Sequence, residues 1–265
     1  MNRQAQSAVL FLLGASLLHA GTTDLYLRYV KAGLRPLVLA SGAVLIVAAA
    51  ATVWYERKRA RRHKQNSERN SGQNDEQIGE QIGEHNGEQK DEQAHCHSEP
   101  RVSWLLILPL LALILVAPPA LGSYSATRSG TALQEPLAYP DLPAADPLSL
   151  SVVDYAGRAV YDHGRTLQGR RVQLSGFLAL DRDGTPYLVR MSLNCCAADA
   201  QSVKVALTGQ VPPVLQPDTW LRITGTYTPR RMKDPVNGGP IPFIEVTEAK
   251  PVAAPKDPYE ESPSG

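Results

Sequence analysis

The sequence predicts an α+β membrane protein, in which N-terminal transmembrane helices precede a small all-β, OB-like barrel domain. Two observations predict this class. Three hydrophobic stretches lie within the first 122 of the 265 residues, and a helix needs about 20 such residues to cross a bilayer. Five short stretches with alternating apolar and polar residues follow residue 169, and this period is typical of strands that bury one face.

Residues 1–55 are expected to form two transmembrane helices. The first hydrophobic stretch, 7–27, contains several polar residues and only just reaches the required length. A cleavable signal peptide is the alternative, because Leu18-His19-Ala20 weakly matches a small-residue cleavage site. The second stretch, 34–54, carries one charge near its start and ends in Trp54-Tyr55, as expected at an interface.

Positive charge predicts how these helices are oriented. Six Lys and Arg residues lie within 57–64, after the second stretch, whereas only three lie within 28–35, between the first two stretches. Cytoplasmic loops carry the excess of Lys and Arg. We therefore expect a multi-pass protein of the inner or plasma membrane, with a cytoplasmic N-terminus and an extracytoplasmic C-terminal domain.

Residues 56–101 are expected to form a disordered cytoplasmic loop. The stretch is polar, contains Glu-Gln-Ile-Gly repeats from Glu76, and has too few apolar side chains to offset the entropy of ordering. Residues 102–122 follow as the third expected transmembrane helix, with Trp104 near its start and Pro118-Pro119 near its end.

The polar loop contains a secondary metal candidate, His95, Cys96 and His97. Imidazole and thiolate groups are ligands that suit zinc and related ions. The alternative is chance composition in a biased segment, because three close ligands without a fixed geometry bind weakly.

The C-terminal half divides into three parts. Residues 123–168 are rich in Pro, Ala and Ser and are expected to form a linker with a short helix. Residues 169–250 form the β domain, with a sandwich of fewer strands as the alternative to a barrel. Residues 251–265 are expected to be a flexible tail. The five predicted strands are 171–180, 187–193, 202–207, 220–227 and 241–246.

The main site candidate is the adjacent pair Cys195 and Cys196 together with Asp199. Three cysteines in the chain make no disulfide framework. The pair can pack as small apolar side chains with Asp199 capping a turn, form a vicinal disulfide, or offer soft ligands to a thiophilic metal ion. Consecutive strand residues point to opposite faces, so both sulfurs can reach one ion only where the strand ends.

Charge and motif content exclude several function classes. Fourteen basic and fifteen acidic residues follow residue 101, so the domain has no basic face for nucleic acid. The chain contains no phosphate-binding loop, no Ser-His-Asp order and no complete zinc motif. We therefore expect no enzyme activity.

The chain resembles the YcgQ-like family of permease subunits, whose members combine N-terminal helices, a variable polar loop, a further helix and a small β domain. Four groups of residues carry the resemblance: 117–122 (Ala-Pro-Pro-Ala-Leu-Gly), 169–172 with Gly176-Phe177, the Cys-Cys-Ala-Ala-Asp-Ala string within 190–200, and Asp218-Thr219-Trp220 with Thr224-Gly225-Thr226. The resemblance implies a partner, a multi-helix permease subunit in the same lipid bilayer. Metal or metalloid handling is suggested by analogy alone.

Two functions follow as expectations. In the first, the chain is the accessory subunit of a two-component permease, since its predicted spans contain no deep charged residue that could line an ion path. In the second, it is a membrane-anchored metal or redox sensor without a transport role.

Overall fold

The computed structural model describes residues 3–74, 111, 119–211 and 216–261. The chain forms two compact units. One unit contains Met1–His19 and Leu37–Pro118, and the other contains Ala20–Pro36 and Pro119–Gly265. The second unit therefore includes the connection between the first two hydrophobic stretches as well as the whole β domain.

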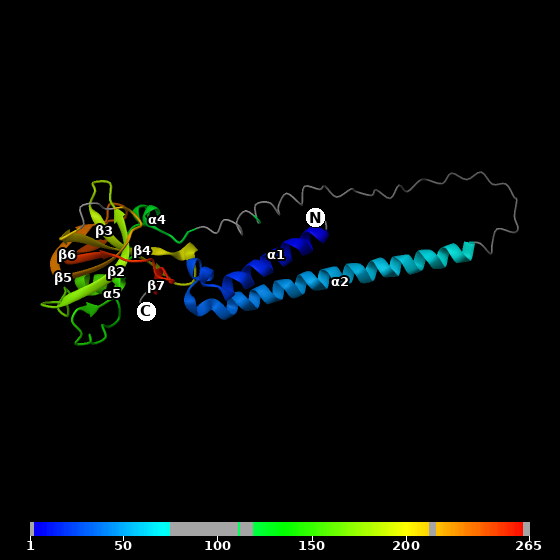
Figure 1. Ribbon diagram of the computed structural model, residues 1–265, viewed down its shortest axis with the longest axis horizontal. Helices are drawn as coiled ribbons and strands as arrows, with labels where there is room; N and C mark the ends of the chain where they lie inside the picture. Colours follow the sequence, from blue (N-terminus) through cyan, green and yellow to red (C-terminus); the bar gives the residue numbers. More distant parts are fainter. Residues whose placement is uncertain (1–2, 75–110, 112–118, 212–215, 262–265) are drawn as a thin grey trace. The chain divides into compact units, whose positions relative to one another are not determined.

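The first unit is built on two helices, α1 (Arg3–Thr22) and α2 (Arg35–Asn74) (Figure 1). They approach each other closely at two glycines. A Cβ atom on Gly14 would lie 2.8 Å from Ile46 Cγ1, and one on Gly42 would lie 3.0 Å from Leu18 Cγ. Small residues that let two backbones approach are typical of helix packing in lipid.

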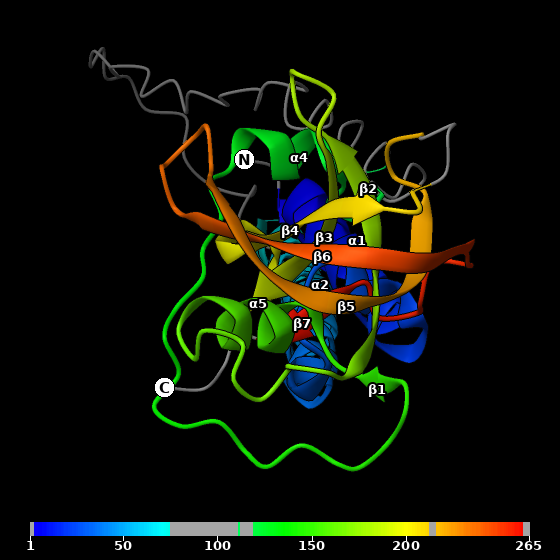
Figure 2. The same cartoon turned by 90° about the vertical axis from the view of Figure 1, so that its left-hand side faces the viewer.

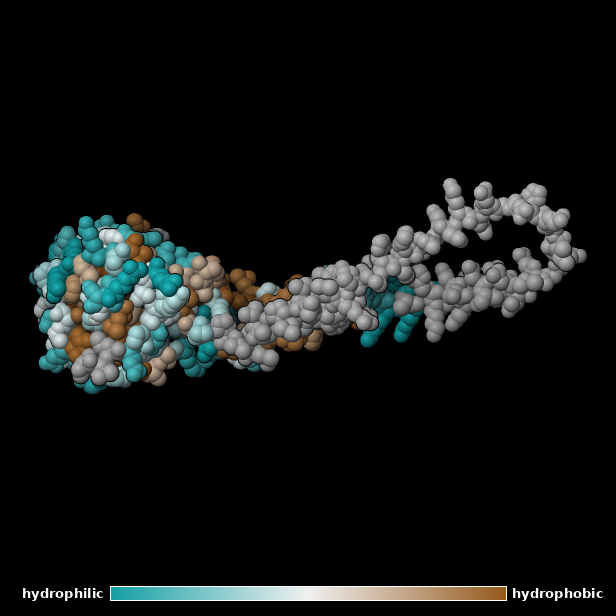
Figure 3. Space-filling view, turned by 90° about the horizontal axis from the view of Figure 1, so that it is seen from above, coloured by the Kyte–Doolittle hydropathy of each residue, from teal (hydrophilic) through white to brown (hydrophobic). Residues whose placement is uncertain are grey.

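One part of the described helices, Ala32–Arg59, is long and apolar enough to cross a membrane by length and composition. The apolar part of α1, Gln6–Thr22, is shorter. In Figure 3, brown apolar patches are visible on the helical part where grey atoms do not cover it, whereas teal polar residues cover much of the β domain.

The boundary at residue 55 differs from the prediction, because α2 continues to Asn74. Residues 56–65, just past that boundary, are rich in Glu, Arg, Lys and Gln, which are good helix formers, so a polar composition does not end the helix here. The rest of the predicted loop 56–101 lies outside the described residues. Of the third predicted span, 102–122, only Leu111 and 119–122 are described.

The predicted five-stranded barrel is confirmed. Strand β2 pairs with β3 and β5, β3 pairs with β4, and β5 pairs with β6, all antiparallel; β4 and β6 pair in parallel and close the ring. Figure 2 views the barrel from the left-hand side of Figure 1. The five strands are β2 (Arg171–Leu180), β3 (Pro186–Leu193), β4 (Gln201–Gly209), β5 (Trp220–Lys233) and β6 (Pro240–Pro251).

Short elements before β2 complete the domain. Strand β1 (Leu148–Ser149) pairs in parallel with β2, and α5 (Val152–Val160) follows it. The Ser151 hydroxyl accepts the Asp154 backbone N–H at 2.9 Å, a typical N-cap contact. The predicted linker therefore contains ordered structure, including a second short helix, α4 (Ser123–Arg128).

The barrel strands bury apolar side chains on both faces. Leu178 and Leu188 belong to a core that includes α5 residues, whereas Phe177 and Val189 belong to a second core that includes Ala126 of α4. Helices α4 and α5 lie on opposite sides of the barrel (Figures 1 and 2). Burial on both faces explains why β3 is buried along almost its whole length.

The prediction of a flexible tail, 251–265, is wrong for residues 259–261, which form a further strand. Strand β7 (Tyr259–Glu261) pairs in parallel with β3. The Glu260 carboxylate accepts the backbone N–H groups of Val152 and Val153, both at 3.1 Å, at the first turn of α5. It also pairs with Arg190 at 3.2 Å. These partners are distant in sequence, so the composition of the tail does not indicate them.

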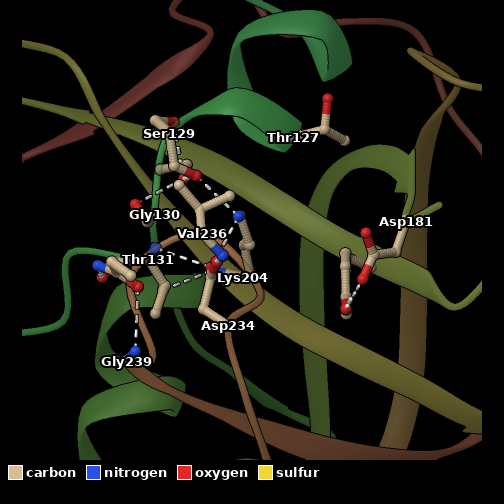
Figure 4. Close-up of polar contacts among 12 residues, drawn as sticks. Thr127, Ser129, Gly130, Thr131, Asp181, Lys204, Asp234, Val236 and Gly239 are labelled. Carbon is tan, nitrogen blue, oxygen red and sulfur yellow. Dashed lines mark hydrogen bonds and ion pairs between the residues drawn. The ribbon is translucent and has the colours of Figure 1, made fainter.

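A buried ion pair holds the segment after α4 against the barrel (Figure 4). Lys204 Nζ lies 2.7 Å from Asp234 Oδ2, and the two side chains are 2% and 0% exposed. The ammonium group also donates to the Ser129 carbonyl at 2.8 Å, and the carboxylate accepts the Thr131 N–H at 2.9 Å. Both charges are thus paired and hydrogen-bonded, as buried charges must be.

Candidate functional site

The cysteine pair lies in the connection between β3 and β4. Strand β3 ends at Leu193, and a 3₁₀ turn (η4) covers Ala197–Asp199 before β4 begins. Cys195 and Cys196 therefore lie beyond the last strand residue. Side chains alternate between opposite faces only as far as Leu193, where the strand ends. The two adjacent sulfurs can therefore approach one ion, as expected from the sequence.

The three candidate ligands are close together. One ligand atom from each of Cys195, Cys196 and Asp199 lies within 4.8 Å of the other two. Both thiols are free, and Cys195 is exposed while Cys196 is half-buried. An exposed thiol argues against a pure packing role for Cys195, because cysteines that only pack are typically buried.

Asp199 fixes the shape of this loop. Its carboxylate accepts the backbone N–H of Cys195 at 2.9 Å and that of Asn194 at 3.2 Å. The predicted capping role is therefore partly right, but the carboxylate caps the turn that precedes it. The 3₁₀ turn itself begins at Cys196 without a side-chain cap.

The electrostatics of the loop keep Cys195 protonated at neutral pH. Its hydrogen bond to Asp199, with a smaller contribution from Cys196, raises the pKa of the Cys195 thiol to about 11. The same hydrogen bond from Cys195 holds the pKa of Asp199 below its usual range. A metal ion that binds here must displace a proton from sulfur, because the thiolate is the ligand.

The loop is also held by a distant segment of the chain, residues 29–31, in the connection between α1 and α2. This segment belongs to the same compact unit as the β domain. Two main-chain hydrogen bonds join it to the loop, from Ala197 N–H to Tyr29 O at 2.7 Å and from Lys31 N–H to Cys195 O at 3.1 Å, and together they form an antiparallel bridge between Val30 and Cys196.

Further contacts extend this attachment. The Tyr259 hydroxyl donates to the Arg28 carbonyl at 2.8 Å, and Lys256 pairs with Asp24 at 3.0 Å. Residues 29–31 have no sequence feature that predicts their place beside the cysteines, since most of these contacts are made by the main chain.

The arrangement can supply two sulfur ligands and one carboxylate oxygen. Thiolates select soft or borderline ions, and three protein ligands leave a fourth position of a tetrahedral site open. The same two thiols can also be oxidised to a vicinal disulfide. The secondary candidate, His95, Cys96 and His97, lies outside the described residues.

Comparison with known proteins finds a family match in the β domain. Residues 146–260 match the family described as "DUF1980 C-terminal domain". No curated protein matches the chain, and no solved structure matches it. The match covers β1, α5, the five barrel strands and part of β7, including the cysteine loop.

Proposed function

We propose that the chain is a membrane-anchored accessory subunit of a two-component permease, and that its β domain binds a thiophilic metal ion through Cys195, Cys196 and Asp199. One observation carries the proposal. The three ligand atoms lie within 4.8 Å of one another, on a loop that is open to solvent at Cys195 and held by main-chain contacts from residues 29–31.

The donor set determines the class of ion. Two thiolates and one carboxylate favour ions such as Zn²⁺ and Cd²⁺ over Mg²⁺ and Ca²⁺, which prefer oxygen ligands. Asp199 is ionised and accepts a hydrogen bond from the Cys195 thiol. It therefore lies next to the thiol proton that metal binding displaces. Two thiols and one carboxylate suit capture and release better than permanent structural binding, for which four protein ligands are usual.

Three features support the membrane anchor and the accessory role. Ala32–Arg59 is long and apolar enough to span a bilayer. The contact between 29–31 and 195–197 agrees with the predicted orientation, in which the first connection and the β domain share the extracytoplasmic side. The apolar part of α2 up to Tyr55 has no charged residue after Arg35, so it offers no ion path of its own and requires a partner for transport.

The metal site is tested by titrating the purified full chain, in detergent, with Cd²⁺ and following thiolate-to-cadmium absorbance. A Cys96→Ser background removes the third cysteine and serves as the matched control. Saturable binding of about one ion is expected in this background, and the further change Cys195→Ser with Cys196→Ser should abolish it. Unchanged binding after that double substitution would remove the site from the proposal.

The accessory role is tested separately. The full chain, purified by affinity under mild detergent, should retain a multi-helix membrane protein, and deletion of either component should abolish the same metal flux in cells.

The free vicinal thiols also favour the alternative, a metal or redox sensor. A sensor predicts that Cys195→Ser with Cys196→Ser changes a metal response while flux through every membrane partner stays unchanged.

A further inference from the structure

The β-domain unit contains a second feature that the metal site does not use, a groove of about 900 Å³. Small-molecule sites commonly measure about 300–1,000 Å³. Its walls come from residues 24–28 of the α1–α2 connection, 119–125 at the start of the β-domain unit, and 254–258 before β7. Phe177 and Trp220 of the barrel also line it.

The lining of the groove is mainly apolar, with aromatic residues at its base. Trp220 is half-buried and packs edge-on against Phe177, with ring centroids 5.9 Å apart. Leu25 and Leu121 line the same groove. The Arg190 guanidinium lies 4.9 Å over the Trp220 ring. Tryptophan is enriched at membrane–water interfaces, because its ring is amphipathic.

One positive charge in this lining has no ion-pair partner among the described residues. Lys256 pairs with Asp24, and the Asp218 carboxylate accepts the N–H and hydroxyl of Ser123 at 2.6 and 2.9 Å. Arg28 is exposed, and only its backbone carbonyl is engaged, by Tyr259. The lining thus carries two acidic and two basic side chains, and of the two bases Arg28 is the one without an ion-pair partner among the described residues. Its guanidinium is a group that binds phosphate well.

The position of Arg28 along the chain brings it close to the bilayer surface. The apolar segment Ala32–Arg59 begins four residues after it. Four residues span at most about 14 Å even when fully extended, so Arg28 lies within about 14 Å of the start of the apolar segment, beside a headgroup region about 5–7.5 Å deep on each side of the bilayer. Asp24, on the same wall, follows the end of α1 at Thr22 by two residues.

We propose that this groove holds one phospholipid of the surrounding bilayer, with its phosphate on Arg28 and an acyl chain against Leu25, Leu121 and Trp220. The inference rests on the membrane anchoring in the proposed function and is independent of the metal site. Charge complementarity favours a phospholipid over a purely apolar protein segment, because only the phospholipid offers an anion to the exposed Arg28 guanidinium.

Tryptophan fluorescence tests the proposal, since the chain has only three tryptophans, Trp54, Trp104 and Trp220. The full chain with W54F and W104F reports on the groove through Trp220 alone. The full chain with W104F and W220F reports on α2 through Trp54. Both are reconstituted in nanodiscs of phosphatidylglycerol, with brominated or unbrominated acyl chains. Bromine quenches tryptophan only at short range, so Trp220 emission should fall in the brominated discs.

A titration tests the phosphate contact. Delipidated W54F/W104F protein in detergent is titrated with brominated phosphatidylglycerol. Adding Arg28→Ala should raise the half-quenching concentration about fivefold, the loss of about one lipid–cation contact. Arg182→Ala, an exposed arginine of the β2–β3 turn outside the groove, is the matched control and should leave it unchanged.

The outcomes separate the two proposals. Quenching of Trp54 without quenching of Trp220 would overturn the lipid site and leave the membrane anchor standing. Absence of quenching for both would overturn the anchor and the lipid site together. If bromine quenching of Trp220 changed only when the permease partner was added, the groove would bind a segment of that partner, and the proposal would be overturned. An unchanged titration for Arg28→Ala would overturn the phosphate contact.

Discussion

Asp234→Ala should be among the most destabilising single changes in the β domain. It removes a carboxylate that is 0% exposed and that accepts hydrogen bonds from Lys204 Nζ, Thr131 N–H and Val236 N–H. The Lys204 ammonium would keep only the Ser129 carbonyl. Removing one partner of a buried ion pair costs about 3–5 kcal/mol. At about 2–4 °C per kcal/mol for a domain of this size, the unfolding midpoint should fall by about 6–20 °C.

The assay is thermal unfolding of the full chain in detergent, followed by Trp220 fluorescence in the W54F/W104F background. Two further variants interpret the result. Lys204→Met added to Asp234→Ala should recover part of the loss, because the uncompensated buried charge is gone. Lys250→Ala breaks an exposed ion pair with Glu248 and should change stability by no more than about 1 kcal/mol. If Asp234→Ala shifted the midpoint no more than Lys250→Ala, the buried pair would not hold the domain together as described.

Three other changes have defined outcomes. Glu260→Ala leaves the buried Arg190 guanidinium with only the Tyr259 carbonyl as acceptor and leaves two N–H groups of the first turn of α5 without one, so urea unfolding should show a loss of about 1.5–3 kcal/mol; an unchanged midpoint would mean that the tail is not part of the folded domain. Asp199→Asn should lower the pKa of Cys195 from about 11 toward its ordinary value. At about pH 8 iodoacetamide should then alkylate it about tenfold faster, because the thiolate gain outweighs the loss of nucleophilicity; mass spectrometry of the labelled peptide measures the rate, and an equal or slower rate would contradict the hydrogen bond. Gly14→Val should separate α1 from α2 and lower the yield of an engineered interhelical disulfide, whereas Gly33→Ala, which meets no atom within 4 Å, should not.

The strands of the barrel could be predicted because alternation of apolar and polar residues is a local signal. The prediction ended the fourth strand at Tyr227, two residues before Pro229, whereas β5 continues to Lys233. Its pairing with β6 shifts register between Tyr227 and Arg231. A bulge is one of the places where a strand tolerates proline, and sequence alone does not separate a bulge from a strand end.

The tail could not be predicted for a different reason. Residues 259–261 are too few to show a period, and their order comes from pairing with β3 and from Glu260 on α5 and Arg190. These are tertiary contacts between segments more than 60 residues apart. Local composition therefore pointed to a loose end where long-range contacts determine the structure.

The residues of the candidate site could be predicted from the sequence, but the chain segment that contacts them could not. The short spacing of Cys195, Cys196 and Asp199 indicated that they could meet if the strand ended in time, and the end of β3 at Leu193 meets that condition. The contacts from residues 29–31 involve main-chain N–H and carbonyl groups, which every residue type except proline can provide.

Main-chain pairing between 29–31 and 195–197 has an evolutionary consequence. Substitutions at Tyr29, Val30 or Lys31 that avoid proline preserve the N–H and carbonyl groups that the thiol loop uses. Gain or loss of one residue in this connection would shift the paired groups out of register. Related proteins that share the site should therefore keep the number of residues between the two apolar helices constant.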